Sequence, residues 1–192
     1  PELYLKRCVV GGFERVYEVA RCFRNEGIDH SHNPEFTQVE GYLAYMDYEQ
    51  LMTFLEEMIR EVIVACGLDP AAVPFKGNLL NFADAWPRIT FRDAILSHAK
   101  IDIEQFPDRD AIAKQAAKMG VPVEKTDGHA TIVDNIYKNY VRTNIVQPTY
   151  LIDYPVEISP LAKRKAGDPR YVEMFQLVYG EGVENVKAFS EL

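Results

Sequence analysis

The sequence is poor in cysteine and has no long apolar run. Its three cysteines, Cys8, Cys22 and Cys66, are widely spaced and form no CxxC pair. An odd number of scattered cysteines argues against both a disulfide framework and a zinc site. No apolar stretch approaches the roughly 20 residues that a membrane-spanning helix needs, and no signal-peptide pattern opens the chain. We therefore expect a soluble cytoplasmic protein that makes no membrane contact.

Positive charge is also scarce. The chain of 192 residues has 21 lysines and arginines against 29 aspartates and glutamates, a formal net charge of -8. Such a chain offers no broad attractive field to nucleic acid, so any contact with RNA must be local. The basic run LAKRK at 161–165 is a candidate for such a contact, although three basic residues also suit a solvated turn. Hydrophobic content of 47% is ordinary for a globular domain.

The first third of the chain predicts a hairpin between two helices. Residues 2–10 read as a short helix. Residues 13–26 and 35–46 are rich in β-branched and aromatic side chains and flank a polar loop, which predicts an antiparallel hairpin. Asp47 suits the N-cap of a helix over 48–66, whose apolar residues recur at helical spacing and which Gly67 ends.

The rest of the chain predicts helices followed by strands. Three segments with amphipathic helical periods fall within 86–146, which indicates a helical insertion. Strands are expected in 147–160, 170–180 and 184–192. Because strands and helices do not alternate regularly, the predicted fold class is α+β: an antiparallel sheet with flanking helices and a helical insertion.

Alternate residues of the hairpin place charged and aromatic side chains on one face. Strand residues two apart face the same side of a sheet. The face has the composition of a pocket wall, although a solvated face with cross-strand ion pairs worth roughly 0.2–1 kcal/mol each would look similar. Its members are Arg24 and Glu26 on the first strand and Phe36, Gln38, Glu40 and Tyr42 on the second.

The loop beside this face favours a nucleotide site. His32 and Asn33 precede Pro34 and offer hydrogen-bonding groups, and Phe36 offers a ring for stacking. Arg24 can hold a phosphate or a carboxylate through two parallel hydrogen bonds. A nucleotide would use all of these groups. The pair His30 and His32 lacks a nearby third ligand, so hydrogen bonding is favoured over metal binding there.

At this point the sequence resembles a known family. The stretch FRNEG…HNPEFTQVE resembles motif 2 of class II aminoacyl-tRNA synthetases. Together with PELYLKR, IDYPVEISPLAKR and AFSEL, it is similar to lysyl-tRNA synthetases, although aspartyl and asparaginyl relatives share the hairpin. The resemblance spans most of the chain and is weakest over 68–147. It implies a partial class II catalytic domain over 1–192, with the insertion at about 86–146.

The resemblance implies an ATP-dependent ligase. Lysine and ATP would form lysyl-adenylate, lysine would pass to the 3′ end of lysine tRNA, and the full-length enzyme would be a homodimer. Arg24, the catalytic residue, would bridge the carboxylate of lysine and the α-phosphate of ATP. Glu26 would bind the adenine amino group and Phe36 would stack on adenine. His32 and Asn33 would lie beside the nucleotide, with His32 towards the outer phosphates.

The resemblance also implies a lysine pocket and a metal site. Glu40 would bind the α-amino group of lysine. The ε-ammonium would lie among Glu2, Tyr42 and Glu191. Glu184 and Glu191 would hold Mg²⁺ ions that bridge the phosphates, and Glu184 would thereby also contribute to ATP binding.

The sequence departs from the family pattern in several places. Motif 1, motif 3 and the anticodon-binding barrel are not expected in this stretch, so we expect the isolated chain not to charge tRNA. Lys187 stands where the family usually has asparagine. Glu184 and Glu191 are seven residues apart, so a regular strand would point them to opposite faces, and a bulge or bend must intervene if both hold metal.

Two other functions fit part of this pattern. One is the shorter paralogue that attaches lysine to elongation factor P, which shares the hairpin; SPLAKR and the insertion favour the synthetase. The other is a non-catalytic synthetase-like protein that binds a partner or an amino acid. Lys187 permits the second function, whereas the retained Arg24, Glu26, Glu40 and Glu191 argue against it.

Overall fold

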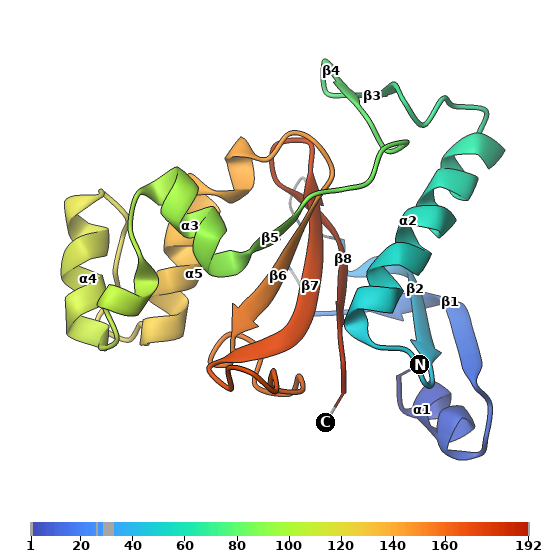
Figure 1. Ribbon diagram of the computed structural model, residues 1–192, viewed down its shortest axis with the longest axis horizontal. Helices are drawn as coiled ribbons and strands as arrows, with labels where there is room; N and C mark the ends of the chain where they lie inside the picture. The colour runs from blue at the N-terminus through green and yellow to red at the C-terminus, as the bar shows by residue number, and fades with distance from the viewer. Residues whose placement is uncertain (1, 26, 29–32, 192) are drawn as a thin grey trace. The chain divides into compact units, whose positions relative to one another are not determined.

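A computed structural model of the protein describes residues 2–25, 27–28 and 33–191 (Figure 1). Contacts divide the chain into two compact units, residues 1–47 and 48–192. The division follows from strand pairing, since the two strands of the first unit pair with each other and the remaining described strands form separate sheets.

The first unit consists of a helix and a hairpin. Helix α1 (Glu2–Val10) is followed by strands β1 (Arg15–Phe23) and β2 (Glu35–Leu43). The strands pair antiparallel with Val19 opposite Val39, and α1 contacts both of them. The helix and the antiparallel hairpin predicted from the sequence are thereby confirmed.

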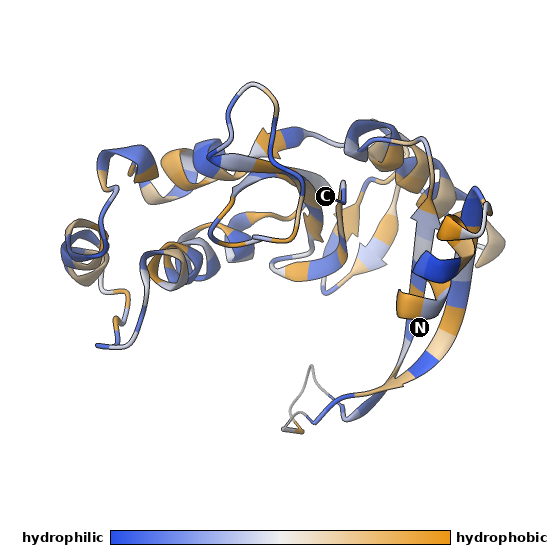
Figure 2. Cartoon of the chain, turned by 90° about the horizontal axis from the view of Figure 1, so that it is seen from below, coloured by the Kyte–Doolittle hydropathy of each residue, from blue (hydrophilic) through white to orange (hydrophobic). Residues whose placement is uncertain are grey.

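The two faces of this hairpin differ in exposure. Even-numbered residues of both strands share one face and are mostly half-buried, whereas odd-numbered residues are mostly exposed. Hydrophobic and hydrophilic residues both occur along these two strands (Figure 2). The exposed face is nevertheless partly apolar, since the Tyr17 and Phe23 side chains are 77% and 69% exposed. The half-buried face is the one that carries the residues predicted to bind substrates.

The second unit is built on a four-stranded sheet in the order β5-β6-β7-β8. Its strands are β5 (Arg88–Thr90), β6 (Thr149–Pro155), β7 (Tyr171–Tyr179) and β8 (Val183–Phe189). The last three strands pair antiparallel as predicted, but β5 pairs parallel with β6, so the sheet is mixed. The prediction of a purely antiparallel sheet is wrong because β5 lies inside the stretch read as helical and is too short to show a strand period.

Helices lie on both sides of this sheet (Figure 1). Helix α2 (Tyr48–Ala65) packs on one face, and Gly67, in the left-handed region, follows its end as predicted. Helices α3 (Phe91–Ala99), α4 (Arg109–Lys118) and α5 (His129–Tyr140) occupy the stretch predicted to be a helical insertion. Helices α3 and α5 pack on the other face of the sheet, and α4 packs against α5.

Alternation along the central strands supplies both hydrophobic cores. Tyr150 and Phe175 pack with α2, while Leu151 and Met174 pack with α3 and α5, and each of the four is at most 1% exposed. A strand buried on both faces reads as a nearly continuous apolar run, and β7 shows this pattern except at Glu173 and Gln176. Within the described residues, no helix is both long and apolar enough to cross a membrane.

Short structures complete the second unit. A small hairpin of β3 (Val73–Phe75) and β4 (Asn78–Leu80) precedes β5, and 3₁₀ turns follow α3 and α5 at Ile103–Gln105 and Arg142–Asn144. The sequence of residues 68–85 does not predict these strands, because each strand of the hairpin is only three residues long.

The turn between β7 and β8 requires glycine at position 180, and this requirement can be tested. Gly180 has φ +55°, and a Cβ there would lie 2.5 Å from the Phe75 ring. We expect Gly180→Ala to lower the free energy of unfolding by roughly 1–2 kcal/mol for the left-handed backbone and by a further ~1–3 kcal/mol for overpacking. Urea denaturation measures the loss.

Gly120→Ala is the matched control. Gly120 also has a positive φ, +77°, but a Cβ added there would meet nothing within 4 Å. It should therefore show the backbone cost without the packing cost. Equal losses for the two variants would contradict the role assigned to the Phe75 contact.

Candidate functional site

Arg24 and Phe36 lie together at the end of the hairpin. The Arg24 amide donates to the carbonyl oxygen of Pro34 at 2.8 Å, which continues the strand pairing one residue beyond Phe23. The Arg24 guanidinium carbon lies 5.1 Å from the centroid of the Phe36 ring, within the range of a cation–π contact. The prediction that these two side chains share a face is confirmed.

The predicted nucleotide loop is described only in part. Asn33 is exposed and lies directly before Pro34, at the end of the loop that leads into β2. Glu26 and His32, also predicted to contact ATP, lie outside the described residues. Of the predicted nucleotide-binding residues in the first unit, the structure therefore locates Arg24, Asn33 and Phe36.

Glu40 and Tyr42 form a bonded pair further along the same face. The Tyr42 hydroxyl donates to Glu40 Oε1 at 2.8 Å, as residues two apart on one strand can do. Glu40 lies directly opposite Glu18 in the strand register. Two carboxylates facing each other across a strand pair repel unless a cation shares them. The face is thus suited to bind a positively charged group.

One ammonium already lies near two of the predicted lysine-binding residues. Lys6 Nζ is 2.7 Å from Glu2 Oε1 and 5.6 Å from the centroid of the Tyr42 ring. Its hydrogen bond and charge lower the pKa of the Glu2 carboxyl. Sequence reasoning overlooked Lys6, although its position four residues after Glu2 on a helix was a signal for the ion pair. Glu2 and Tyr42 can therefore be reached by the same ammonium.

In the second unit, Glu184 is held by residues from the helical stretch. The Tyr137 hydroxyl donates to Glu184 Oε1 at 2.8 Å, and Arg142 Nη1 lies 3.7 Å from Oε2. Burial raises the pKa of Tyr137, and nearby Tyr154 and Glu184 raise it further, so Tyr137 remains a donor. Sequence reasoning missed Tyr137 and Arg142, because both lie where the family resemblance is weakest.

A bulge in β8 changes the sheet face on which Glu184 lies. Leu177 pairs with Val186 whereas Val178 pairs with Glu184, so Asn185 is an extra residue on β8. The extra residue changes the alternation, so that Glu184 shares a sheet face with Lys187, while Glu191 lies beyond the end of β8 and forms a bridge with Ala162. The irregularity that the seven-residue spacing required is thereby confirmed.

The carboxylates predicted to hold Mg²⁺, both among the described residues, form no closed metal site by themselves. Among the described residues, no three histidine, cysteine, aspartate or glutamate side chains gather into a metal cluster. Mg²⁺, however, commonly uses one or two carboxylates together with substrate phosphates and water. Glu184 is a carboxylate that could supply one such ligand, and Glu191, beyond the end of β8, is the second that the sequence predicts. Lys187, on the same face as Glu184 and opposite Gln176, adds a positive charge that would oppose a cation there.

The basic run at 161–165 makes internal contacts. Lys165 Nζ lies 2.6 Å from Asp153 Oδ2, and Lys163 Nζ lies 3.6 Å from Glu173 Oε2. Arg164 Nη1 donates to the Pro169 carbonyl oxygen at 2.7 Å. The run is therefore neither a free solvated turn nor an unengaged basic patch.

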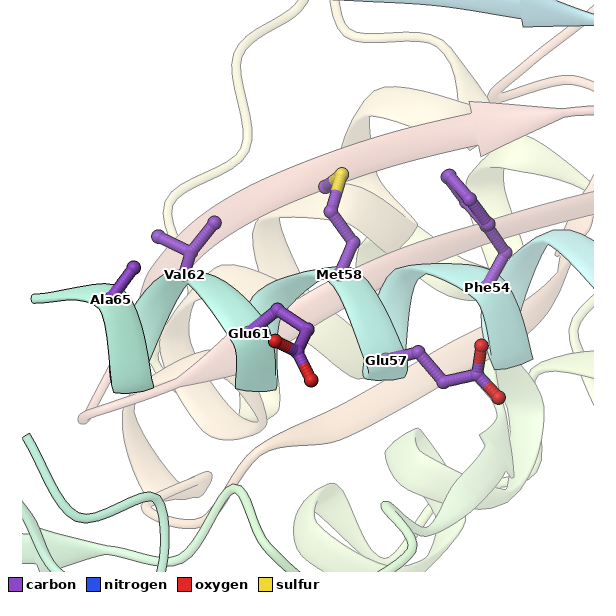
Figure 3. A pocket seen from close by; sticks show the side chains of 6 residues that line it. All are labelled: Phe54, Glu57, Met58, Glu61, Val62 and Ala65. Atoms are coloured by element: carbon purple, nitrogen blue, oxygen red, sulfur yellow. The ribbon is translucent and has the colours of Figure 1, made fainter.

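Two depressions in the second unit lie away from the residues predicted to bind lysine, ATP or Mg²⁺, although Arg164 lines the first of them. One is a cleft of about 360 Å³ between the start of α5 and residues 155–158. The other is a shallow hollow along α2, where an apolar row runs beside two carboxylates (Figure 3). Neither is lined by a residue predicted to bind lysine, ATP or Mg²⁺. The hollow on α2 is lined by Phe54, Glu57, Met58, Glu61, Val62 and Ala65.

Comparison with known proteins identifies the family. The family model described as tRNA synthetases class II (D, K and N) matches residues 1–192. A lysine--tRNA ligase of Dehalococcoides mccartyi is 44% identical over 193 residues, and one of Pelotomaculum thermopropionicum is 45% identical over 195. Each alignment covers 100% of this chain and 38% of the relative, so the chain spans about two fifths of the length of these relatives. The chain belongs to the class II tRNA synthetases of the D, K and N group.

Proposed function

We propose that this chain is the central part of the catalytic domain of a lysine--tRNA ligase. Such an enzyme activates lysine with ATP to lysyl-adenylate and transfers lysine to the 3′ end of lysine tRNA. The observation that carries the proposal is the half-buried hairpin face, where Arg24 lies against Phe36 and Tyr42 bonds Glu40. Relatives named lysine--tRNA ligase, at 44–45% identity over the whole chain, support lysine as the substrate.

Arg24 would carry the activation step. The carboxylate of lysine, already ionised at neutral pH, attacks the α-phosphorus of ATP in line, an oxygen–phosphorus bond forms, and pyrophosphate leaves. No general base is needed, so catalysis rests on positioning and on neutralising negative charge. The planar guanidinium of Arg24 can bond one oxygen from each reactant at once. Phe36, in contact with Arg24, would orient the guanidinium and stack on adenine.

Carboxylates would select lysine. Glu40, held by Tyr42, would bind the α-amino group, while Glu2, Tyr42 and Glu191 would bind the ε-ammonium. The position of the Lys6 ammonium beside Glu2 and Tyr42 supports this assignment, since it is the same chemical group. An amino acid without a terminal cation would leave these carboxylates unpaired in the occupied site, which allows discrimination of ~10⁴ or more.

The remaining roles concern the nucleotide. Glu184 and Glu191 would hold Mg²⁺ together with the phosphates, and the metal would supply charge neutralisation when bound. Tyr137 would keep the Glu184 carboxylate oriented, because its hydrogen bond occupies one carboxylate oxygen. Asn33 would lie beside the nucleotide, as would Glu26 and His32. The full-length enzyme would act as a homodimer on lysine, ATP and lysine tRNA.

ATP–pyrophosphate exchange by the full-length protein tests this function. It should depend on lysine and should not proceed with asparagine, with aspartate or without an amino acid. Exchange with asparagine or aspartate would show that the pocket belongs to a different member of the family. Absence of exchange from a folded protein would support a non-catalytic binding role. If lysine is activated, transfer assays with lysine tRNA and with elongation factor P identify the acceptor.

A further inference from the structure

Asp153 adopts an unfavourable backbone conformation in the middle of a buried strand. Its φ is +57°, in the left-handed region, and β6 changes register between Ile152 and Tyr154 at this point. The residue is only 8% exposed. A residue with a Cβ persists in such a conformation only where its surroundings hold it there, and such positions cluster at functional sites. The contacts of Asp153 therefore indicate which role its backbone conformation has in the protein.

Two side chains from distant segments hold the Asp153 carboxylate. Lys165 Nζ donates to Oδ2 at 2.6 Å, and the Tyr48 hydroxyl donates to Oδ1 at 3.1 Å. Burial lowers the pKa of Lys165, but the hydrogen bond and charge of Asp153 outweigh burial and leave that pKa raised. Burial and the charge of Asp153 raise the pKa of Tyr48 to about 12. Both partners are therefore protonated donors at neutral pH.

Lys165 ends a segment whose backbone is hydrogen-bonded to β7 and to the residues that follow β8. Its amide donates to the Tyr171 carbonyl oxygen at 3.0 Å, and Arg164 forms a bridge with Val172 at the start of β7. On the other side, Ala162 forms a bridge with Glu191. Residues 161–165 thus lie beside the beginning of β7 and beside the residues that follow β8.

A closed set of three backbone hydrogen bonds fixes the position next to Glu191. The Lys163 amide donates to the Ser190 carbonyl oxygen at 2.9 Å, the Ser190 amide to the Glu173 carbonyl oxygen at 2.9 Å, and the Glu173 amide to the Lys163 carbonyl oxygen at 2.8 Å. Each of the three residues is both donor and acceptor. Movement of residues 161–165 would therefore break the contacts that place Ser190 and Glu191.

We propose that Asp153 and Lys165 are positioning residues for Glu191. Their ion pair fixes residues 161–165 against the sheet, and the backbone of that segment in turn fixes Ser190 and Glu191. The inference rests on the proposed function, in which Glu191 binds the lysine ammonium and Mg²⁺. It also gives the basic run a role in the architecture of the site that does not involve RNA.

Lys165→Met in the full-length protein tests the proposal. We expect the KM for lysine and the Mg²⁺ concentration for half-maximal exchange to rise roughly tenfold or more, as is usual when a group that orients a ligand is removed. Lys165→Arg, which can still pair with Asp153, should recover most of the loss. The matched control is Lys163→Met, because the Lys163 side chain is 57% exposed and lies 3.6 Å from Glu173. Equal effects of the methionine variants at 163 and 165 would overturn the proposal.

A double-mutant cycle separates positioning from general destabilisation. If Lys165 acts through Glu191, Lys165→Met should cause little further change in lysine KM once Glu191→Gln is present. Independent, additive effects would show that Lys165 acts elsewhere. This readout distinguishes the proposed role from a merely structural one, since loss of stability would affect both backgrounds alike.

Hydrogen exchange provides a readout that does not require activity. Asp153→Asn suits this experiment in case Lys165→Met fails to fold, because asparagine tolerates the left-handed region and retains the shape of the side chain. The Lys163 and Ser190 amides should exchange at least about tenfold faster in the variants than in the parent. Unchanged protection of these amides against hydrogen exchange would overturn the proposal whatever the catalytic result. If the parent protein instead showed no lysine-dependent ATP–pyrophosphate exchange, that result would count against the proposed function alone.

Discussion

Arg24→Lys should lower kcat/KM for lysine-dependent ATP–pyrophosphate exchange by roughly 10²–10³-fold, the usual effect of losing a donor that stabilises developing charge. Lysine retains the positive charge but has no planar fork, so it cannot bond an oxygen of each reactant in fixed geometry. The interaction strengthens as negative charge develops at the α-phosphate. The loss should therefore fall mainly on kcat, with a smaller change in the KM for ATP.

Arg21→Lys is the control for this change. Arg21 lies on the same strand but on the exposed face, where its Nε is 3.3 Å from Glu35 Oε1 and its side chain is 71% exposed. A surface ion pair of this kind contributes little. Exchange by Arg21→Lys should match that of the parent. Retention of more than about a third of parental exchange by Arg24→Lys would remove Arg24 from the reaction, given the loss expected for a bidentate contact.

Glu40→Gln should raise the KM for lysine by roughly 10²-fold, because removing one member of a charge pair that ligand binding desolvates costs several kcal/mol in binding. Glutamine keeps the carbonyl oxygen that can accept from Tyr42, so the change removes charge with little change in shape. The α-amino group of lysine would lose its ionic partner. The KM for ATP should stay nearly unchanged, since Glu40 has no role in nucleotide binding.

Glu18→Gln tests whether the effect belongs to position 40. Glu18 lies directly opposite Glu40 and carries the same charge on the same face, but it is the more exposed of the two. A general loss of negative potential would affect both variants alike. Specific recognition by Glu40 would leave the Glu18 variant within a few fold of the parent. Equivalent KM values for the two variants would contradict the assigned role.

Much of the hairpin could be predicted because its signals are local. Alternation with a period of two identifies the strands, and the polar loop between them specifies an antiparallel pair. The register then places Phe36 opposite Cys22 and Glu40 opposite Glu18, so one face collects the predicted residues. The helix over 48–66 could be predicted for a similar reason, since its apolar period is strong and Gly67 ends it.

The contacts that hold the second unit together could not be predicted in this way. Tyr137 bonds Glu184 across 47 residues of sequence, and Lys165 bonds Asp153 across 12. Such pairs depend on the packing of separate elements, which no local period records. Strand β5 could not be predicted for a different reason, since its three residues are too few to show an alternation.

The bulge in β8 lies between these cases. The sequence requires an irregularity if Glu184 and Glu191 are to act together, but it does not identify which residue is extra. Asn185 takes that position because the pairing of β7 continues on both sides of it. The metal-binding role assigned to Glu184 and Glu191 therefore predicts that a bulge is present, and the structure shows where it lies.

The left-handed backbone at position 153 restricts how the sequence can diverge there. Most residues with a Cβ pay a conformational penalty at φ +57°, and β-branched residues are the least compatible. Asparagine and glycine alone combine small size with tolerance of this region, and of the two only asparagine can still accept a hydrogen bond from Tyr48. Among descendants of this protein, position 153 should accordingly vary within a much narrower set of amino acids than its neighbour Ile152.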